Sequence, residues 1–136
     1  MGISVPGAIG AKLVHPEKKI LAVCGDGGFM MNCQEFETAL RAKTPFVTLV
    51  FNDSSYGLIK WKQMDQYGKS CCVDFTNPDF VKFAESMGAI GYRITKAEDL
   101  VPTLKKAFEQ NVPVIIDCPV DYAENTKLTA HLKELM

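Results

Sequence analysis

Two acidic residues that follow apolar runs could bind a hard metal ion. Asp26 lies between glycines in the segment AVCGDGGFMM, and Asp53 follows Asn52 in the segment FNDSSYG. Carboxylate and backbone carbonyl oxygens are the ligands of Mg²⁺ or Ca²⁺, and Mg²⁺ usually adds water and phosphate oxygens. The glycines let a ligand approach the backbone, and the N-terminus of a following helix would offer N–H groups to an anion. The pattern indicates a site for a diphosphate together with Mg²⁺ or Ca²⁺.

Each acidic residue also has a purely structural interpretation. Asp is a favoured N-cap residue, so Asp26 could instead cap a helix, and Asp53 could instead be a turn residue. The segment GDGGF lacks both the GxGxxG spacing of dinucleotide folds and the GK[ST] ending of a P-loop. From the residues alone, both interpretations stay open.

Short apolar segments alternate with helical patterns, and this alternation predicts the sheet that positions the two acidic residues. The predicted strands cover residues 19–24, 46–51, 91–94 and 113–118. Strands that alternate with helices form a parallel sheet sandwiched between helix layers, an α/β fold whose ligands bind at the carboxyl ends of the strands. Because Asp26 and Asp53 leave successive strands, we expect them to face each other at that edge.

The apolar spacing predicts three helices between the strands. The first ends before Thr44, and the second is capped by Asn77 and ends at Gly88. The third begins at Thr95, because Thr95 and Glu98 have the spacing of a capping box. The residues expected to be buried by these helices are Phe29, Cys33, Phe36 and Leu40, then Phe80, Ala84 and Met87, then Leu100, Leu104, Ala107 and Phe108. Residues 62–76 are expected to form an irregular polar loop, and residues 121–136 a polar tail.

The composition argues against several classes of partner. The chain has 136 residues, 47% apolar and 23% charged, with 15 basic and 16 acidic residues, as in one ordinary globular domain. No basic block is long enough to follow a phosphate backbone, so we expect no nucleic-acid partner. No apolar run approaches the roughly 20 residues that span a bilayer, and the N-terminus does not resemble a signal peptide. We therefore expect a cytoplasmic protein without a membrane partner.

The five cysteines indicate neither a disulfide framework nor a zinc site, because their number is odd and no CxxC spacing occurs. Cys24, Cys33 and Cys118 lie in apolar segments and are predicted to be small core residues. Cys71 and Cys72 lie in a polar stretch, where an ordinary loop or strand is the prediction and a redox-sensitive pair is the alternative.

The triplet Gly25-Asp26-Gly27, followed after 24 residues by Asn52-Asp53, resembles the thiamin diphosphate motif of thiamin-dependent decarboxylases and carboligases. The resemblance implies that Mg²⁺ is held by Asp26, the Asp53 carboxylate and the Ser55 backbone oxygen, and that it bridges to the diphosphate. It also implies that the N–H groups of Gly27 and Gly28 meet the diphosphate. Asn is the usual residue at position 53 of the motif, although an acidic residue occurs there in catabolic acetolactate synthases.

The chain is most similar to the acetolactate synthases over nearly its whole length. The matching segments are MGISVPGAIGA at residues 1–11, Tyr56-Gly57-Leu58-Ile59, Asn77-Pro78-Asp79-Phe80 and Pro113-Val114-Ile115-Ile116-Asp117. The resemblance implies that pyruvate is decarboxylated and the carbanion-enamine condenses with a second pyruvate to give 2-acetolactate. The implied cofactors are thiamin diphosphate and Mg²⁺. The implied cofactor-binding residues are Met1, Gly25, Asp26, Gly27, Gly28, Asp53, Ser55, Tyr56, Gly57, Leu58 and Ile59, although ordinary helix packing is the alternative for Leu58 and Ile59.

The resemblance covers one domain, residues 1–136, of enzymes that carry a pyrimidine domain and a central domain ahead of it. The catalytic glutamate of such enzymes lies in the pyrimidine domain, so we expect this chain to be inactive alone. Without the other domains, apolar interface surface would be exposed, so we also expect a homo-oligomer. Lys62 stands where biosynthetic relatives carry a Trp that favours 2-ketobutyrate, which implies pyruvate as the acceptor. Two alternatives stay open: the same domain of another 2-keto acid decarboxylase or oxidase, and a non-catalytic module that binds Mg²⁺ and a phosphorylated ligand.

Overall fold

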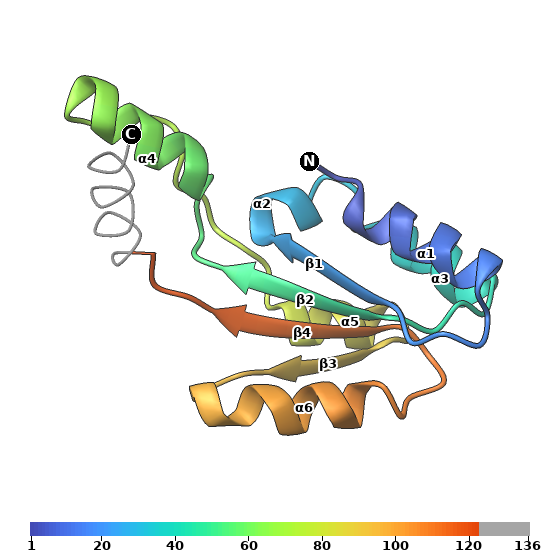
Figure 1. Cartoon of the computed structure of the whole chain (residues 1–136). Coiled ribbons are helices and arrows are strands. Elements are labelled where there is room, and N and C mark those ends of the chain that lie inside the picture. The colour runs from blue at the N-terminus through green and yellow to red at the C-terminus, as the bar shows by residue number, and fades with distance from the viewer. Residues whose placement is uncertain (123–136) are drawn as a thin grey trace, which may run out of the picture.

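A four-stranded parallel sheet forms the centre of the protein, and a computed structural model describes residues 1–122. The strands lie in the order β1-β2-β4-β3, with every neighbouring pair parallel (Figure 1). Their bounds are β1 (Leu21–Gly25), β2 (Val47–Asn52), β3 (Ile90–Arg93) and β4 (Val114–Pro119). The predicted α/β fold is confirmed. Residues 123–136, most of the predicted tail, lie outside the described residues.

Helices cover the two faces of the sheet unequally. The helices that pack on one face are α1 (Ser4–Val14), α2 (Asp26–Phe29), α3 (Glu35–Arg41) and α5 (Phe80–Ser86). Their core centres on Phe29, whose ring makes edge contacts with Phe36 and Phe80 at centroid distances of 5.9 and 5.4 Å. The other face packs against α6 (Leu100–Ala107) through Val114 and Ile116. No helix in the described part of the chain is long and apolar enough to cross a bilayer.

The predicted first helix is wrong as a single element, because two short helices, α2 and α3, replace it. The Asn32 side chain donates to the Gly2 carbonyl at 2.7 Å and holds the turn between the two helices against the start of the chain. Phe29 and Phe36 are nevertheless both fully buried, as predicted, whereas Cys33 is half-buried against the same core. The core contacts therefore survive the break in the helix.

The predicted starts of the next two helices are also wrong. Asp79 caps α5, since its Oδ1 accepts from the N–H groups of Val81 and Lys82 at 3.0 and 3.3 Å, and Asn77 is engaged elsewhere. A 3-10 turn, η1 (Ala97–Asp99), precedes α6 in place of a capping box. The Thr95 hydroxyl instead hydrogen-bonds with the Asp99 carboxylate at 3.1 Å.

The predicted loop over residues 62–76 is wrong in its first part, because α4 (Gly57–Tyr67) extends to Tyr67. The helix ends at Gly68, which has a φ of 67° and whose N–H donates to the Met64 carbonyl. No residue of α4 is buried, and Figure 1 shows the helix standing beyond the carboxyl ends of β2 and β4. Apolar periodicity could not reveal the full helix, because α4 lacks a face packed on the core.

The strand register brings the two acidic loops to one edge of the sheet. Gly25 at the end of β1 pairs with Phe51 of β2, and Asn52 pairs with Pro119 of β4. Asp26 therefore leaves the sheet at the level where β2 ends, and Asp53 follows one residue later. The predicted adjacency of the two strands is confirmed.

Candidate functional site

The Asp26 carboxylate is buried and accepts hydrogen bonds from three separate segments. Its Oδ1 accepts from the Gly27 N–H at 2.8 Å, and its Oδ2 accepts from the Ser54 N–H at 2.8 Å and from Asn77 Nδ2 at 2.6 Å. The exposed fraction of the residue is only 1%. The N-cap of α2 is Gly25 rather than Asp26, and no side chain caps that helix. Simple helix capping therefore does not account for this side chain.

The Asp53 loop turns back on itself to reach Asp26. Ser54 has a φ of 55°, in the left-handed region that residues other than glycine rarely adopt. The Ser54 N–H points at Asp26, while Asp53 accepts from the Ser55 hydroxyl at 2.8 Å and, more weakly, from the Ser55 N–H at 3.3 Å. The two loops predicted to face each other are thus joined by a direct hydrogen bond. Such backbone outliers persist where the surrounding contacts over-determine them.

Residues 71–77, here called the strap, run beside this loop. The Tyr56 N–H donates to the Val73 carbonyl at 2.9 Å, and the Phe75 N–H donates to the Ser54 carbonyl at 3.0 Å. Ser55 lies opposite Asp74 of the strap, and this pattern of bonds makes the two residues a non-hydrogen-bonded antiparallel pair. The Ser55 carbonyl consequently points away from the strap, on the side where the Ser55 N–H meets Asp53. That orientation leaves the carbonyl oxygen directed to the carboxylate side of the loop.

A chain of polar contacts runs from Asp26 into the sheet. Asn77 Nδ2 also donates to Asn52 Oδ1 at 3.0 Å, and Asn52 Nδ2 donates to Asp117 Oδ1 at 2.9 Å. Asp117 is 2% exposed and pairs with Arg93, whose Nε lies 2.9 Å from Asp117 Oδ2. The hydrogen bond to Asp117 is the main reason that the pKa of the Arg93 guanidinium is raised. The network anchors the site to β2, β3 and β4.

Oxygen atoms of the two joined loops could serve as ligands of a hard metal ion. Asp26, Asp53 and the Ser55 carbonyl supply hard oxygen donors, which suit Mg²⁺ better than a soft ion. The buried Asn77 Oδ1 has no hydrogen-bond partner within the described structure, so the side chain that donates to Asp26 keeps an unused acceptor. No three His, Cys, Asp or Glu side chains of residues 1–122 gather as a metal cluster. The donor set fits a cation completed by oxygens of a ligand and water.

Two glycines allow an aromatic side chain and a carboxylate to approach the loops. A Cβ on Gly27 would lie 2.7 Å from the Tyr56 ring, which also packs on Phe75 at a centroid distance of 4.8 Å. A Cβ on Gly57 would lie 2.8 Å from Asp53 Oδ2. A Cβ on Gly28 would meet no atom within 4 Å. Gly27 and Gly57 are thus required by close packing, whereas Gly28 faces open space.

The remaining predicted residues take no part in the side-chain hydrogen bonds of the site. Leu58 and Ile59, on the first turn of α4, are 66% and 46% exposed, so packing in the core of this chain does not explain them. Met1 is exposed beside the turn that follows α2, where Gly2 meets Asn32. Gly25 ends β1 directly before Asp26. The contacts of these residues with a cofactor stay predictions.

Sequence reasoning missed two side chains at the site. Asn77 was predicted as a helix cap, but it binds Asp26 and Asn52. Tyr122 lies beside Gly57, and the pKa of its phenol is raised first by burial and then by the charges of Asp53 and Asp26. No local pattern marks Tyr122, because it follows the last strand in a segment without periodicity.

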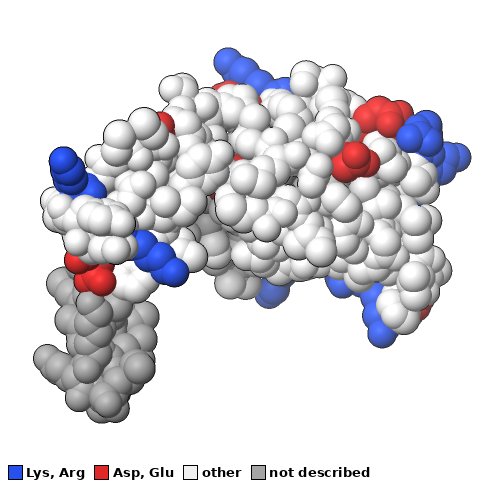
Figure 2. All heavy atoms as spheres, turned by 90° about the horizontal axis from the view of Figure 1, so that it is seen from above, with Lys and Arg blue, Asp and Glu red and all other residues white. Residues whose placement is uncertain are grey.

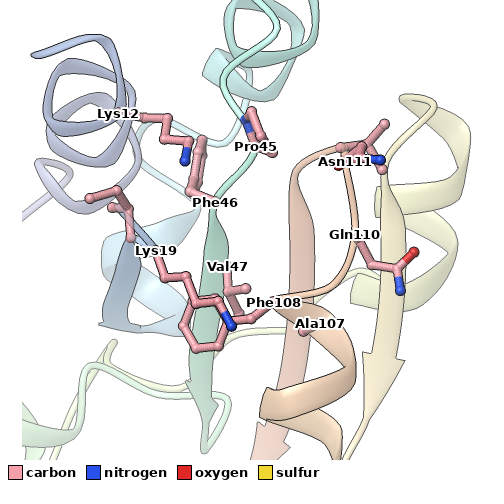
Figure 3. A pocket seen from close by; sticks show the side chains of 11 residues that line it. Lys12, Lys19, Pro45, Phe46, Val47, Ala107, Phe108, Gln110 and Asn111 are labelled. Carbon is pink, nitrogen blue, oxygen red and sulfur yellow. The ribbon is translucent and has the colours of Figure 1, made fainter. Parts of the chain in front are cut away.

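A pocket of about 150 Å³ lies at the opposite edge of the sheet, near the starts of β1, β2 and β4 (Figure 3). Lys19, Phe46 and Phe108 line it, and the Lys19 ammonium lies 5.7 Å from the centre of the Phe108 ring. Its volume is well below the roughly 300 Å³ at which ligand pockets begin. The acidic loops are therefore the stronger candidate for a functional site.

Comparisons with known proteins match the chain to one family of cofactor-binding domains. Residues 1–118 match the family described as thiamine pyrophosphate enzyme, C-terminal TPP binding domain. The acetolactate synthase of Bacillus subtilis (strain 168) is 45% identical over 96% of this chain, and the catabolic acetolactate synthase of Raoultella terrigena is 36% identical over 100%. A thiamine diphosphate-dependent 4-hydroxybenzoylformate decarboxylase of Rhodococcus jostii RHA1 superposes with a TM-score of 0.83 at 27% identity, over 91% of this chain and 24% of that one. The chain spans 23% and 25% of the two synthases, about a quarter of their length.

Replacing Asn77 tests the polar network. We expect Asn77→Ala to lower the free energy of unfolding by about 1–3 kcal/mol, because the buried Asp26 and the half-buried Asn52 each lose a donor. Thr76→Ala, at the exposed neighbouring residue, is the matched control and should change it by less than about 0.5 kcal/mol. Urea unfolding followed by circular dichroism measures both, and equal values for the two variants would show that the Asn77 contacts contribute nothing.

Proposed function

Because this chain belongs to the thiamine pyrophosphate enzymes through their C-terminal TPP binding domain, we propose that it holds Mg²⁺ and the diphosphate of thiamin diphosphate in an acetolactate synthase. The hydrogen bond from the Ser54 N–H to Asp26 carries the proposal, since it joins the two loops that bear the oxygen donors. The similarity to two acetolactate synthases over nearly the whole chain supports the choice of enzyme.

The chain's own residues would bind and orient the cofactor. Asp26, Asp53 and the Ser55 carbonyl would hold Mg²⁺, and the N–H groups of Gly27 and Gly28 would meet the diphosphate. The Gly27 N–H already donates to Asp26 Oδ1, so it would have to serve both groups. When bound, thiamin diphosphate supplies the carbon nucleophile that adds to the keto carbon of pyruvate and holds the electron pair after carbon dioxide leaves.

The rim of the site would bound the substrate. Leu58 and Ile59 project from the exposed first turn of α4, and Tyr56 is held between Gly27 and Phe75. Lys62, exposed on the same helix, stands where biosynthetic relatives are expected to carry Trp. We propose pyruvate as both donor and acceptor, with 2-acetolactate as the product.

The rest of the catalytic machinery would come from outside residues 1–136. The chain covers about a quarter of the related synthases, so their remaining length has room for a pyrimidine domain and a central domain. The glutamate that protonates the aminopyrimidine would lie in the pyrimidine domain. We propose that this chain is one cofactor-binding domain and is inactive alone.

The exposed apolar surface near α1 and α2 supports self-association. Ile3 is 75% exposed, and Met30 and Met31 are also exposed after α2. In Figure 2, few charged side chains lie in the middle of the visible face, and most of them lie toward its two ends. Exposed apolar surface of this kind commonly marks a protein interface. We propose that a second copy of the chain covers it.

Cofactor binding can be measured without catalysis. We expect calorimetric titration of thiamin diphosphate with saturating Mg²⁺ to show binding, and Gly27→Ala to weaken it about tenfold, or about 1.4 kcal/mol, because the new Cβ would displace Tyr56. Gly10→Ala, where a Cβ meets no atom within 4 Å, is the matched control and should bind normally. Absence of heat, both alone and after addition of the pyrimidine domain of the Bacillus subtilis synthase, would contradict the proposed cofactor.

The proposed reaction can be tested in a chimera in which this chain replaces the matching quarter of the Bacillus subtilis synthase. With equal pyruvate and 2-ketobutyrate, we expect mainly 2-acetolactate by chromatography. Lys62→Trp should raise the share of acetohydroxybutyrate, whereas Gln66→Trp, also exposed on α4, should not. Acetohydroxybutyrate as the main product would refute the acceptor assignment, and acetaldehyde alone would favour a simple decarboxylase.

Self-association is tested by sedimentation velocity at micromolar concentration. We expect a dimer or larger species, and we expect the double variant Ile3→Ser and Met31→Ser to shift the population towards monomer. The control is Val101→Ser, which also removes an exposed apolar side chain, but on α6. This variant should leave the mass of the sedimenting species unchanged. A monomeric wild-type chain is the result that would disprove the proposed interface.

A further inference from the structure

We propose that Cys71 and Cys72 form a reversible redox site, whose two thiols close into a disulfide between adjacent residues on exposure to a peroxide. Both cysteines are free and exposed, and their sulfur atoms lie 3.3 Å apart. They occupy the first two positions of the strap that runs beside the Asp53 loop. Neither residue takes part in the proposed binding of Mg²⁺ or the diphosphate.

The backbone brings the two sulfurs to the same side. In extended chain, successive side chains point in opposite directions. Cys72 has a φ of 57°, a left-handed conformation that breaks this alternation and accounts for the sulfur contact. This backbone turn belongs to the reduced protein, so the thiols are already placed for reaction.

A disulfide at this position would be easily reversed. A disulfide needs a sulfur separation of about 2.05 Å and usually joins Cα atoms about 4.4–6.8 Å apart. The Cα atoms of adjacent residues are only about 3.8 Å apart across a trans peptide. The closed ring would therefore be strained, and strained exposed disulfides are the ones that thiols readily reduce.

The other cysteines are poor competitors for an oxidant. Burial raises the pKa of Cys24 to about 11 and is also the main cause of the raised pKa values of Cys33 and Cys118. The pKa of Cys71 is raised mainly by its hydrogen bond with Cys72, and further by the charge on that sulfur. The pair is therefore distinguished from the other three cysteines by its exposure and by the contact between its two sulfur atoms.

The oxidation balances with a hydroperoxide as the oxidant. The thiolate sulfur attacks one peroxide oxygen, the O–O bond breaks, and the leaving hydroxide takes up a proton to become water. The sulfenic acid that forms is attacked by the neighbouring sulfur, so that the S–S bond forms and a second water leaves. Two thiols and one hydrogen peroxide become one disulfide and two waters, with two electrons passing from sulfur to oxygen.

Formation of the disulfide would affect the acidic loops, because the strap connects the two cysteines to them. The Cys71 N–H donates to Gln63 Oε1 of α4 at 2.9 Å, and the next residue after the pair, Val73, accepts from the Tyr56 N–H. Farther along, Lys60 pairs with Asp74 at 2.7 Å, and Asn77 binds Asp26. Rotation of the Cys71–Cys72 backbone would move the Val73 carbonyl and weaken the support of this loop. This effect on cofactor affinity rests on the proposed function, whereas formation of the disulfide does not.

Peptide mapping tests the redox site directly. The reduced chain is treated with equimolar hydrogen peroxide, alkylated with iodoacetamide and digested with trypsin, which releases residues 70–82 with both cysteines and no other. We expect this peptide to be lighter than its reduced form by two hydrogen atoms and to carry no label, and dithiothreitol added before alkylation should restore two labels. Cys71→Ser and Cys72→Ser should each abolish the loss of mass, whereas Cys24→Ser should retain it. A labelled dithiol peptide after treatment, or a cross-link from this pair to another cysteine, would overturn the proposal.

Calorimetry of the oxidised chain separates the two parts of the inference. We expect oxidation to weaken Mg²⁺-dependent binding of thiamin diphosphate several-fold, with recovery after dithiothreitol and no such change in Cys71→Ser. A disulfide that leaves the affinity unchanged would overturn control of the loop by the strap. If the reduced chain binds no cofactor even with an added pyrimidine domain, the proposed function fails, and the peptide masses still decide whether the redox site exists.

Discussion

Burial of the Asp26 charge is the constraint on which the rest of the site depends. A buried carboxylate is costly unless hydrogen-bond donors replace its water. The donors come from the start of α2, from the turn after β2 and from the strap, in the form of Gly27, Ser54 and Asn77. These segments are distant in sequence, so one side chain fixes the positions of three loops at the carboxyl edge of the sheet.

The cost of arranging those donors is visible in the surrounding structure. Ser54 must adopt a left-handed φ to point its N–H at Asp26, and the strap must pair with residues 54–56 to hold that turn. Asn77 is in turn held by Asn52, which hydrogen-bonds with Asp117 inside the sheet. Arg93 completes the network by pairing with Asp117, so a buried charge in the sheet is also satisfied. The left-handed conformation of Ser54 and the ion pair between Arg93 and Asp117 therefore both belong to the network that holds the Asp26 carboxylate.

Local sequence patterns predicted the frame of this site but could not predict its long-range partners. Apolar runs and the order of the elements were sufficient to place Asp26 and Asp53 at one edge of a parallel sheet, as the register confirms. The cap preference near Asn77 and Asp79 did not identify which residue caps α5, because both are good caps and only the approach of Asp26 occupies Asn77. The Asn32 contact with Gly2 likewise breaks a helix whose apolar spacing looks continuous. Both errors arise where a polar side chain has a partner far away in sequence.

The two halves of the site differ in how firmly they are anchored. Asp26 follows β1 directly and begins α2, next to a core in which Phe29 is fully buried, whereas Asp53 accepts hydrogen bonds from Ser55 within its own loop. The helix that follows Asp53, α4, buries none of its residues. Segments with little buried apolar surface open at lower free energy than core elements. A cation shared by the two carboxylates would offset their mutual repulsion and join the weakly anchored half to the firm one, so the proposed metal would order the loop as well as bind phosphate.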